Sequence, residues 1–378
     1  MLMINKGNIE SILNTSIAEL CLYLFLLLKP LYLLPSGTLQ IGDFFLVISF
    51  LFCILEKKKI PFNKKDINFY LFVLFVIFIN SVYCIYYFFT AEILHFFKTN
   101  LYYIFNLFAV ISFRNFSTNK KFQDNICNIF IFNIFFQMIS VFLHFGVWYG
   151  GSRFMGTYND PNQFAFAILT TCCMILCITS DYTKKIICIV ASMYLIFISG
   201  STGMLGAMML IIFFSIFRRL IHRPIIFLSV ISLFVLSFSF FTSYIEKINL
   251  SAFRLENKLN SGNPIESFIY DRNIDLVLNN LEKCLYGVGE GFLTRFEGNS
   301  LEVHSTWIGL IFYYGIIPFV YLLLWIIEQL KKIKMTYIPI FVAIIIEAFT
   351  LANQRQPSFW ILFLLAQACT KEEEKYVD

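Results

Sequence analysis

The chain has 378 residues, of which 58% are hydrophobic and 14% are charged, and its mean hydropathy is +0.73. Soluble domains are far less apolar, so this composition excludes a water-soluble fold. The formal net charge of +5 does not indicate a nucleic-acid partner, because Lys and Arg lie in short clusters between apolar runs. In that position they act as topology signals.

The amino-terminal region and the cysteines add few constraints. The chain runs through Lys6 and Glu10 into an apolar stretch without an A-x-A-like cleavage site, so we expect a retained first span rather than a cleaved signal. Nine of the ten cysteines lie in or beside apolar segments, which implies no disulfide framework. Cys172, Cys173 and Cys177 have no accompanying His, and we interpret them as core residues rather than metal ligands.

Apolar segments recur along the chain and predict about twelve transmembrane helices. They are expected near residues 14–34, 41–56, 67–89, 99–114, 124–148, 163–180, 185–199, 204–217, 224–244, 305–328, 335–351 and 357–370. The stretch from Ile186 to Phe217 is divided into two passes with a turn at residues 200–203. A single helix of that length would be about 45–50 Å long and would place basic clusters on both sides of the membrane.

The linkers predict how these helices are oriented. Basic linkers follow every second span: EKKKIPFNKKD, RNFSTNKK, DYTKK, FRRLIHR and EQLKKIK. Such linkers mark the cytoplasmic side, whereas the linkers between them carry little charge. The predicted fold class is therefore an all-α polytopic membrane protein, a single integral membrane domain over residues 1–378 with both termini in the cytoplasm.

Two long polar stretches, residues 149–162 and 245–304, fall on the predicted outer side. In the first, Asn159 or Asp160 can cap a helix, and Pro161 suits its first turn. Arg153 is harder to explain, because the positive-inside bias disfavours a cation on this side. It is either a solvated loop residue or part of a site.

The larger outer loop, between the ninth and tenth spans, is expected to be partly helical, since a bare connection of this length is uncommon. Apolar residues follow helical spacing on one face, opposite a polar stripe: Ile274, Val277, Leu278, Leu281 and Leu285 against Arg272, Asp275, Asn279 and Glu282. This pattern predicts an amphipathic helix on the membrane surface. Near its amino-terminal end, Arg272 would favour an anion such as a diphosphate.

A glycine-rich string and a histidine end the outer loop. Gly287, Gly289 and Gly291 permit either tight turns or close approach to a ligand. His304, at the mouth of the tenth span, is either a polar anchor or a functional group. Both alternatives stay open for each feature.

Together these strings resemble the O-antigen polymerase and O-antigen ligase superfamily of bacterial membrane glycosyltransferases. The resemblance covers roughly residues 150–325 and lies in the order of four loose motifs. They are Arg153 before GTYNDPN at 156–162, the Ser-Gly turn at 201–203, Arg272 about fifteen residues before the G-x-G at 287–289, and His304-Ser305 before Gly315. Asp160 and Ser305 depart from the family pattern, in which Asn is usual or frequent at these places.

The resemblance implies a donor glycan linked through diphosphate to a polyprenyl lipid. An acceptor sugar hydroxyl would displace the diphosphate at the anomeric carbon, with inversion. Arg153 and Arg272 would bind the diphosphate, because arginine grips phosphate bidentately at every physiological pH. His304 would help to bind or orient it, or would handle a proton.

Further roles are expected for four other residues. Glu290, beside the glycines, is the candidate acceptor of the hydroxyl proton, although it can equally be a solvated loop carboxylate. Asn162 and Arg295 are candidate substrate contacts, and Arg355 is a further outer-side cation. No Asp-rich cation motif stands out in these loops, so we expect catalysis without a metal or other cofactor.

A polymerase is favoured over a ligase, because family members of this very apolar, aromatic-rich kind are often polymerases. An O-antigen ligase, which transfers the glycan to a lipid-A core or protein, is the alternative. A flippase or transporter should show charges inside the bundle or broken helices in related halves. A non-catalytic scaffold would tolerate loss of the outer arginines.

The expected location is the bacterial inner membrane, with the active site facing the periplasm and the product an O-antigen or related surface polysaccharide. The expected partners are the lipid-linked donor and acceptor and the bilayer, with a chain-length regulator and a flippase as protein partners.

Overall fold

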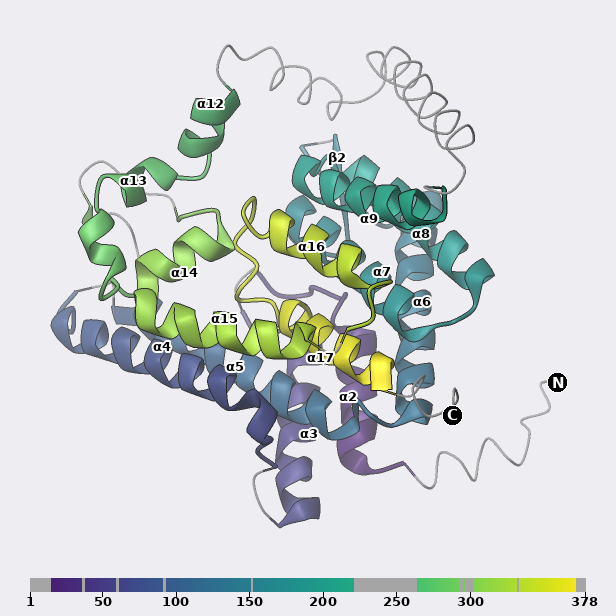
Figure 1. Cartoon of the computed structure of the whole chain (residues 1–378), viewed down its shortest axis with the longest axis horizontal. Coiled ribbons are helices and arrows are strands. Elements are labelled where there is room, and N and C mark those ends of the chain that lie inside the picture. The colour runs from purple at the N-terminus through teal and green to yellow at the C-terminus, as the bar shows by residue number, and fades with distance from the viewer. Residues whose placement is uncertain are drawn as a thin grey trace.

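The described part of the chain is largely helical (Figure 1). A computed structural model describes residues 15–35, 38–58, 61–90, 93–150, 152–220, 264–291, 295–296, 302–331 and 333–371, with residues 216–220 and 366–371 by backbone only. Its longer helices are α2 (Ile17–Leu28), α3 (Ile41–Lys57), α4 (Ile67–Tyr86), α5 (Ile93–Phe116), α6 (Lys120–Phe142), α7 (Pro161–Ile178), α8 (Tyr182–Ser199), α9 (Thr202–Leu220), α14 (Thr306–Tyr314), α15 (Ile316–Leu330), α16 (Ile338–Glu347) and α17 (Pro357–Lys371). Short elements are η1 (Lys64–Asp66), α12 (Pro264–Tyr270), α13 (Ile274–Leu278), η2 (Leu281–Cys284) and the antiparallel strands β1 (Val147–Tyr149) and β2 (Arg153–Gly156).

Five helices within the described ranges are long and apolar enough to cross a membrane. They are Lys64–Tyr86, Ile93–Phe116, Lys120–Phe142, Pro161–Ile178 and Tyr182–Ser199. Shorter apolar helices occupy other expected spans, among them α2, α15 and α16. These features support a helical, membrane-embedded protein. The expected ninth span, 224–244, and much of the large outer loop lie outside the described residues.

Helix α4 has one face buried in the protein and an opposite face of exposed apolar side chains. Phe72, Val76 and Asn80 lie on its buried face, whereas Phe78 and Ile85 are 63% and 76% exposed on the opposite face. Such large apolar side chains turned outward suit contact with lipid tails rather than water.

The core centres on α17, which packs against α5, α7 and α15. Residues 359–365 of α17 are at most 1% exposed, so this helix is enclosed on all sides. Trp360 lies against the rings of Phe69, Phe72 and Trp325. The loop that precedes α17 is therefore attached to a tightly packed helix.

Glycines end two helices of the structure, one at a predicted turn and one inside a predicted span. The predicted turn after span seven is confirmed: Gly200 caps α8 in the left-handed region, and α9 begins at Thr202. The expected span 305–328 is instead broken into α14 and α15 at Gly315, with φ 78° and ψ 177°. At this break the carbonyl oxygens of Phe312 and Tyr313 accept hydrogen bonds from the amides of Val288 and Gly289, 3.2 and 2.8 Å away.

The expected amphipathic helix in the outer loop is also broken. Helix α13 covers only Ile274–Leu278, and residues 281–284 form the 3₁₀ turn η2. Asn273 has a left-handed φ of 52°, and Asn280 leaves the helical region, so the helix is short at both ends. Ile274 and Val277 are buried, whereas Leu281 is 59% exposed. The stripe therefore does not form one continuous apolar face, and a five-residue helix offers little dipole at Arg272.

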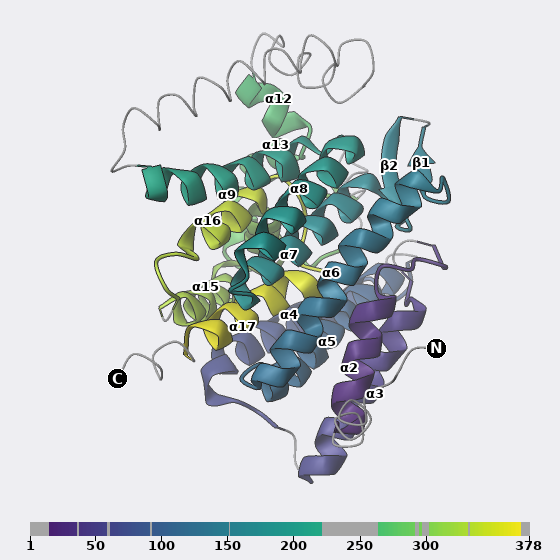
Figure 2. The ribbon, with the colours of Figure 1, turned by 90° about the vertical axis from the view of Figure 1, so that its right-hand side faces the viewer.

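The β1–β2 hairpin and α12, which belong to the two expected outer stretches, lie at one end of the described structure (Figure 2). Figure 2 shows the β1–β2 hairpin and α12 at the same end, and the connection between α3 and α4 at the opposite end. Segments distant in the sequence therefore meet where the polar loops are.

Candidate functional site

A cavity of about 760 Å³ collects the residues that carry the sequence motifs. Arg153, Asn162, Arg272 and His304 all line it, although they come from β2, α7, the α12–α13 link and the segment before α14. The predicted Ser-Gly turn, residues 201–203, lines the same space. We call this space the arginine cavity.

Arg153 is held at the wall of this cavity by two neighbouring elements. Its Nε donates to the carbonyl oxygen of Ser199 at 2.8 Å, at the carboxyl end of α8, and its Nη2 donates to Oδ1 of Asn162 at 2.8 Å. Asn162 is itself fixed because Asp160 caps α7, accepting from the amides of Asn162 and Gln163 at 2.8 and 2.9 Å. The predicted cap therefore also orients the arginine.

Arg272 reaches the same cavity from the outer segment. Its Nε donates to the carbonyl oxygen of Thr350 at 3.2 Å, and its guanidinium lies 4.1 Å from the centre of the Phe268 ring. Burial lowers the pKa of Arg272 from its ordinary value, and Asp271 and Glu347 oppose this shift. An arginine guanidinium ordinarily loses its proton only far above neutral pH, so the group stays a cation at neutral pH.

His304 is tied to Arg272 through the backbone. The amide of His304 donates to the carbonyl oxygen of Arg272 at 3.1 Å. Ser305 then caps α14, which brings the cavity segment directly against a buried helix. The two motifs, thirty-two positions apart in the sequence, are thus adjacent in space.

The loop between α16 and α17 completes the wall and was not singled out as a unit by the sequence motifs. Thr306 Oγ1 donates to the carbonyl oxygen of Leu351 at 2.7 Å and accepts from the amide of Asn353 at 2.8 Å. Asn353 Nδ2 also donates to Oε2 of the buried Glu347 at 2.6 Å. These bonds fix the loop that carries Arg355.

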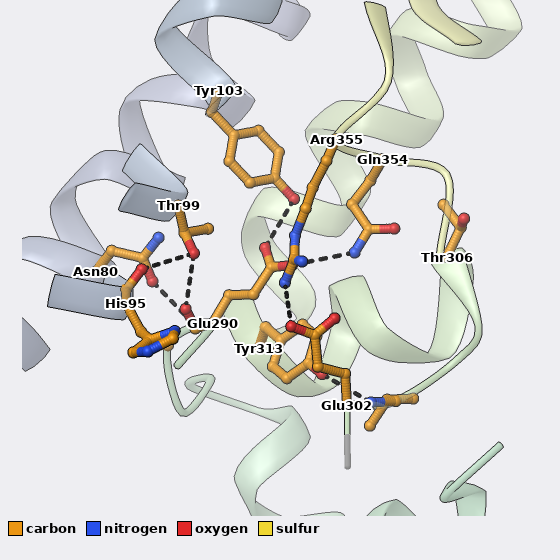
Figure 3. A network of polar contacts seen from close by, with 12 residues as sticks. Asn80, His95, Thr99, Tyr103, Glu290, Glu302, Thr306, Tyr313, Gln354 and Arg355 are labelled. Atoms are coloured by element: carbon orange, nitrogen blue, oxygen red, sulfur yellow. Dashed lines mark hydrogen bonds and ion pairs between the residues drawn. The ribbon is translucent and has the colours of Figure 1, made fainter. Parts of the chain in front are cut away.

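Arg355 is the centre of a buried polar network (Figure 3). Its guanidinium donates to Oε1 of Glu290 at 2.8 Å and to Oε1 of Glu302 at 3.1 Å. Burial by itself lowers the pKa of Arg355, but the two carboxylates outweigh burial and raise it above the ordinary value. A permanent cation therefore lies between two carboxylates.

Glu290 occupies a different position from the one its neighbouring glycines suggested. Its side chain is only 1% exposed. Oε1 accepts from Arg355 and from Gln354 at 3.2 Å, and Oε2 accepts from Tyr103 at 3.2 Å and Tyr314 at 2.5 Å. Each oxygen thus already accepts two hydrogen bonds, which favours an anchoring role over proton transfer.

The glycine-rich string packs against protein rather than opening a phosphate cradle. Gly287 and Gly289 both have positive φ, 81° and 70°. A Cβ on Gly287 would lie 2.6 Å from the carbonyl oxygen of Tyr313, and one on Gly289 would lie 2.7 Å from the Tyr83 ring. Close approach to the end of α14 explains Gly287, and close approach to the rings of Tyr83 and Phe96 explains Gly289.

Arg295 lies apart from the arginine cavity and does not line it. Its Nη2 donates to the carbonyl oxygen of Gly289 at 2.6 Å, and its guanidinium lies 5.0 Å from the centre of the Phe96 ring. Arg295 therefore contacts the glycine string and is not grouped with Arg153 and Arg272 in the arginine cavity.

No family model and no curated protein matches this chain. The function is therefore inferred from the residues of the site. Within the described ranges, no cluster of three His, Cys, Asp or Glu side chains is arranged to hold a metal ion. Chemically, the site presents fixed guanidinium groups and a histidine in one polar cavity, an arrangement suited to a phosphorylated ligand.

Proposed function

We propose that this protein polymerises polyprenyl-diphosphate-linked oligosaccharide repeat units into O-antigen or a related surface polysaccharide. The observation that carries the proposal is the shared cavity of Arg153, Arg272 and His304, three residues from separate motifs of the resembled superfamily. Asn162, which orients Arg153, belongs to the first of those motifs.

The chemistry of glycosyl transfer explains why such a cavity is needed. When an acceptor hydroxyl attacks the anomeric carbon, the departing diphosphate gains negative charge. Guanidinium groups that are already fixed near the leaving oxygens stabilise that charge without reorganisation. Arg153 and Arg272 are held by hydrogen bonds to backbone carbonyls, and so meet this requirement. Direct displacement would invert the anomeric configuration.

The proposal includes a location and topology. About twelve spans, with both termini in the cytoplasm of a bacterial cell, would place the arginine cavity on the periplasmic face of the inner membrane. The alternation of basic and uncharged linkers supports this orientation. On that face the cavity would be open to lipid-linked glycans that a flippase delivers.

The test is deletion of the gene in its host, followed by gel analysis of envelope glycans. Wild type, Arg153→Ala, Arg272→Ala and His304→Ala are then expressed at matched membrane abundance, with Lys120→Ala as control. Lys120 is 55% exposed and lies far from the motifs in sequence, on α6. We expect a core with a single repeat in the deletion strain, and a ladder restored by wild type and the control alone.

Other band patterns would contradict the proposal in different ways. A bare core with long polymer left on the lipid carrier would indicate the ligase. Loss of all repeat units from the outer face, with the lipid-linked repeat retained in the cytoplasmic leaflet, would indicate a flippase. A full ladder from all three variants would refute the assignment of the cavity.

A further inference from the structure

A second cavity, of about 660 Å³, lies beside the arginine cavity. It is bounded by the link between α2 and α3, by α3 and α5, and by residues that precede α17. Gln163, Glu302, Arg355 and Gln356 line both spaces. The two cavities therefore share a wall, and the Glu302–Arg355 ion pair is part of it.

The lining of the second cavity suits a sugar. Tyr32 and Tyr102 supply aromatic surfaces, and Thr38 and Lys98 supply hydrogen-bonding groups. Aromatic faces and polar side chains together match the apolar faces and hydroxyl rims of a pyranose. A donor in the arginine cavity and an acceptor in the second cavity would meet at the shared wall.

We propose that Glu302 is the general base of this enzyme and takes the proton from an acceptor hydroxyl that enters from the second cavity. The inference rests on the proposed polymerase function. Among the residues that the structure describes, Glu302 is the one carboxylate that lines both cavities, and about half of its side chain, 48%, is exposed.

Hydrogen bonding separates Glu302 from the other carboxylates near the second cavity. In Asp43, Oδ1 is bound to Lys29 at 2.7 Å and Oδ2 accepts from the amide of Gln40 at 2.9 Å. Glu290 has four side-chain donors. Glu302 has Arg355 on Oε1, and Oε2 accepts no hydrogen bond from the described residues. One oxygen is therefore available to a substrate hydroxyl.

The backbone around Glu302 is fixed, which a catalytic carboxylate requires. Its carbonyl oxygen accepts from Nδ2 of Asn273 at 2.9 Å, and the next amide, that of Val303, donates to the hydroxyl of Tyr313 at 3.0 Å. Figure 3 shows the Glu302 carboxylate reaching toward the guanidinium of Arg355 from below, whereas Glu290 approaches it from the left.

The charges around Glu302 keep it ready to accept a proton. Burial raises its pKa, but Arg355 outweighs burial and lowers it, and His304 and His95 act in the same direction. The carboxylate is therefore ionised at neutral pH. Arg355 is also bound to Glu290, so its guanidinium is shared between the two glutamates.

The acceptor O–H bond breaks, its proton moves to Oε2 of Glu302, and the acceptor oxygen bonds to the anomeric carbon of the donor. The bond from that carbon to the diphosphate oxygen breaks, and its electron pair leaves with the polyprenyl diphosphate. Arg153 and Arg272 face the leaving group, and Glu302 ends neutral until it releases the proton to water.

The experiment uses purified full-length protein in detergent with lipid-linked repeat units extracted from the deletion strain. Polymer formation is compared for wild type, Glu302→Gln and Glu302→Ala, with Glu282→Gln as the matched control. Glu282 is an exposed glutamate of the same outer segment and lines neither cavity. Binding of sugar-free polyprenyl diphosphate is measured in parallel.

We expect Glu302→Gln and Glu302→Ala to lose about 100-fold or more in polymer formation, the usual effect of removing a general base. Polyprenyl diphosphate binding should change by less than about threefold, which is under 0.7 kcal/mol, and added formate should partly restore the Ala variant. Activity of Glu302→Gln within tenfold of wild type would overturn the inference. A loss of polyprenyl diphosphate binding as large as the loss of polymer formation would also overturn the inference. If wild type itself forms no polymer, the proposed function fails, and the inference fails with it.

Discussion

Replacement of Glu290 should test whether the buried network holds the outer loops together. The Glu290→Ala change removes the acceptor of Arg355, Gln354, Tyr103 and Tyr314 in one step. These donors come from α5, α14 and the loop before α17. The variant should therefore lose contacts between three distant parts of the chain.

The expected size follows from the burial of the ion pair. Breaking a buried pair by removing one partner typically costs about 3–5 kcal/mol. Arg355 is 28% exposed, so water can partly solvate its freed charge, and we expect the lower end, about 3 kcal/mol. Glu290→Gln should cost less, about 1.5 kcal/mol. Its amide oxygen still accepts from Arg355, and its NH₂ group can donate to the tyrosine hydroxyls.

The free energy of unfolding can be measured by SDS titration in mixed micelles, using the fluorescence of the buried Trp325 and Trp360. Glu328→Gln is the matched control, because Glu328 pairs with the exposed Lys331 at 3.3 Å. It should change the free energy by no more than about 0.5 kcal/mol. A cost below 1 kcal/mol for Glu290→Ala, on the order of a surface pair, would refute the anchoring role.

Three further predictions concern the arginine cavity, the glycine string and pH. Arg153→Lys keeps the charge but loses the guanidinium fork, so the rate of polymer formation should fall by about tenfold or more at matched abundance; wild-type activity would mean that charge alone suffices. Gly287→Ala should lower the free energy of unfolding by more than about 1 kcal/mol, the order expected for a strained left-handed residue, because φ is +81° and the new Cβ meets backbone atoms. In the control Gly206→Ala, in α9, the new Cβ meets nothing within 4 Å, so this variant should not be destabilised. Equal free energies of unfolding for the two variants would contradict the packing of Gly287. The ion pair with Arg355 lowers the pKa of Glu302, so this pair stabilises the fold above the ordinary glutamate pKa and loses that effect as the pH falls. The difference in unfolding free energy between wild type and Glu302→Gln should therefore shrink below about pH 4. A difference that grows below that pH would contradict the lowered pKa.

The sequence predicts the helices well where hydrophobicity alone decides them. Apolar runs give α4, α7 and α8 close to their observed bounds, and Asp160 with Pro161 marks the start of α7. The break at Gly315 was not predicted, because it depends on a partner. The amides of Val288 and Gly289 satisfy carbonyls that an unbroken helix would have used internally. Such pairing between distant segments has no local signal.

Part of the candidate site was predicted from the sequence, and part of it depends on the fold. Arg153, Asn162, Arg272 and His304 were singled out by motif order, and the fold brings them to one cavity. The carboxylates cannot be ranked from the sequence, because only the fold buries Glu290 and leaves Glu302 half-exposed on the shared wall. The position of Glu302 two residues before His304 was the available signal.

Composition and charge by themselves determined that this chain belongs in a lipid environment, because so many apolar side chains cannot be covered in water. They also set which residue types are available for a phosphate ligand. Only the tertiary structure decided that Arg355 lies between Glu290 and Glu302 and that two cavities meet there. Burial and shared hydrogen bonds depend on which segments pack together, and that is a property of the whole fold.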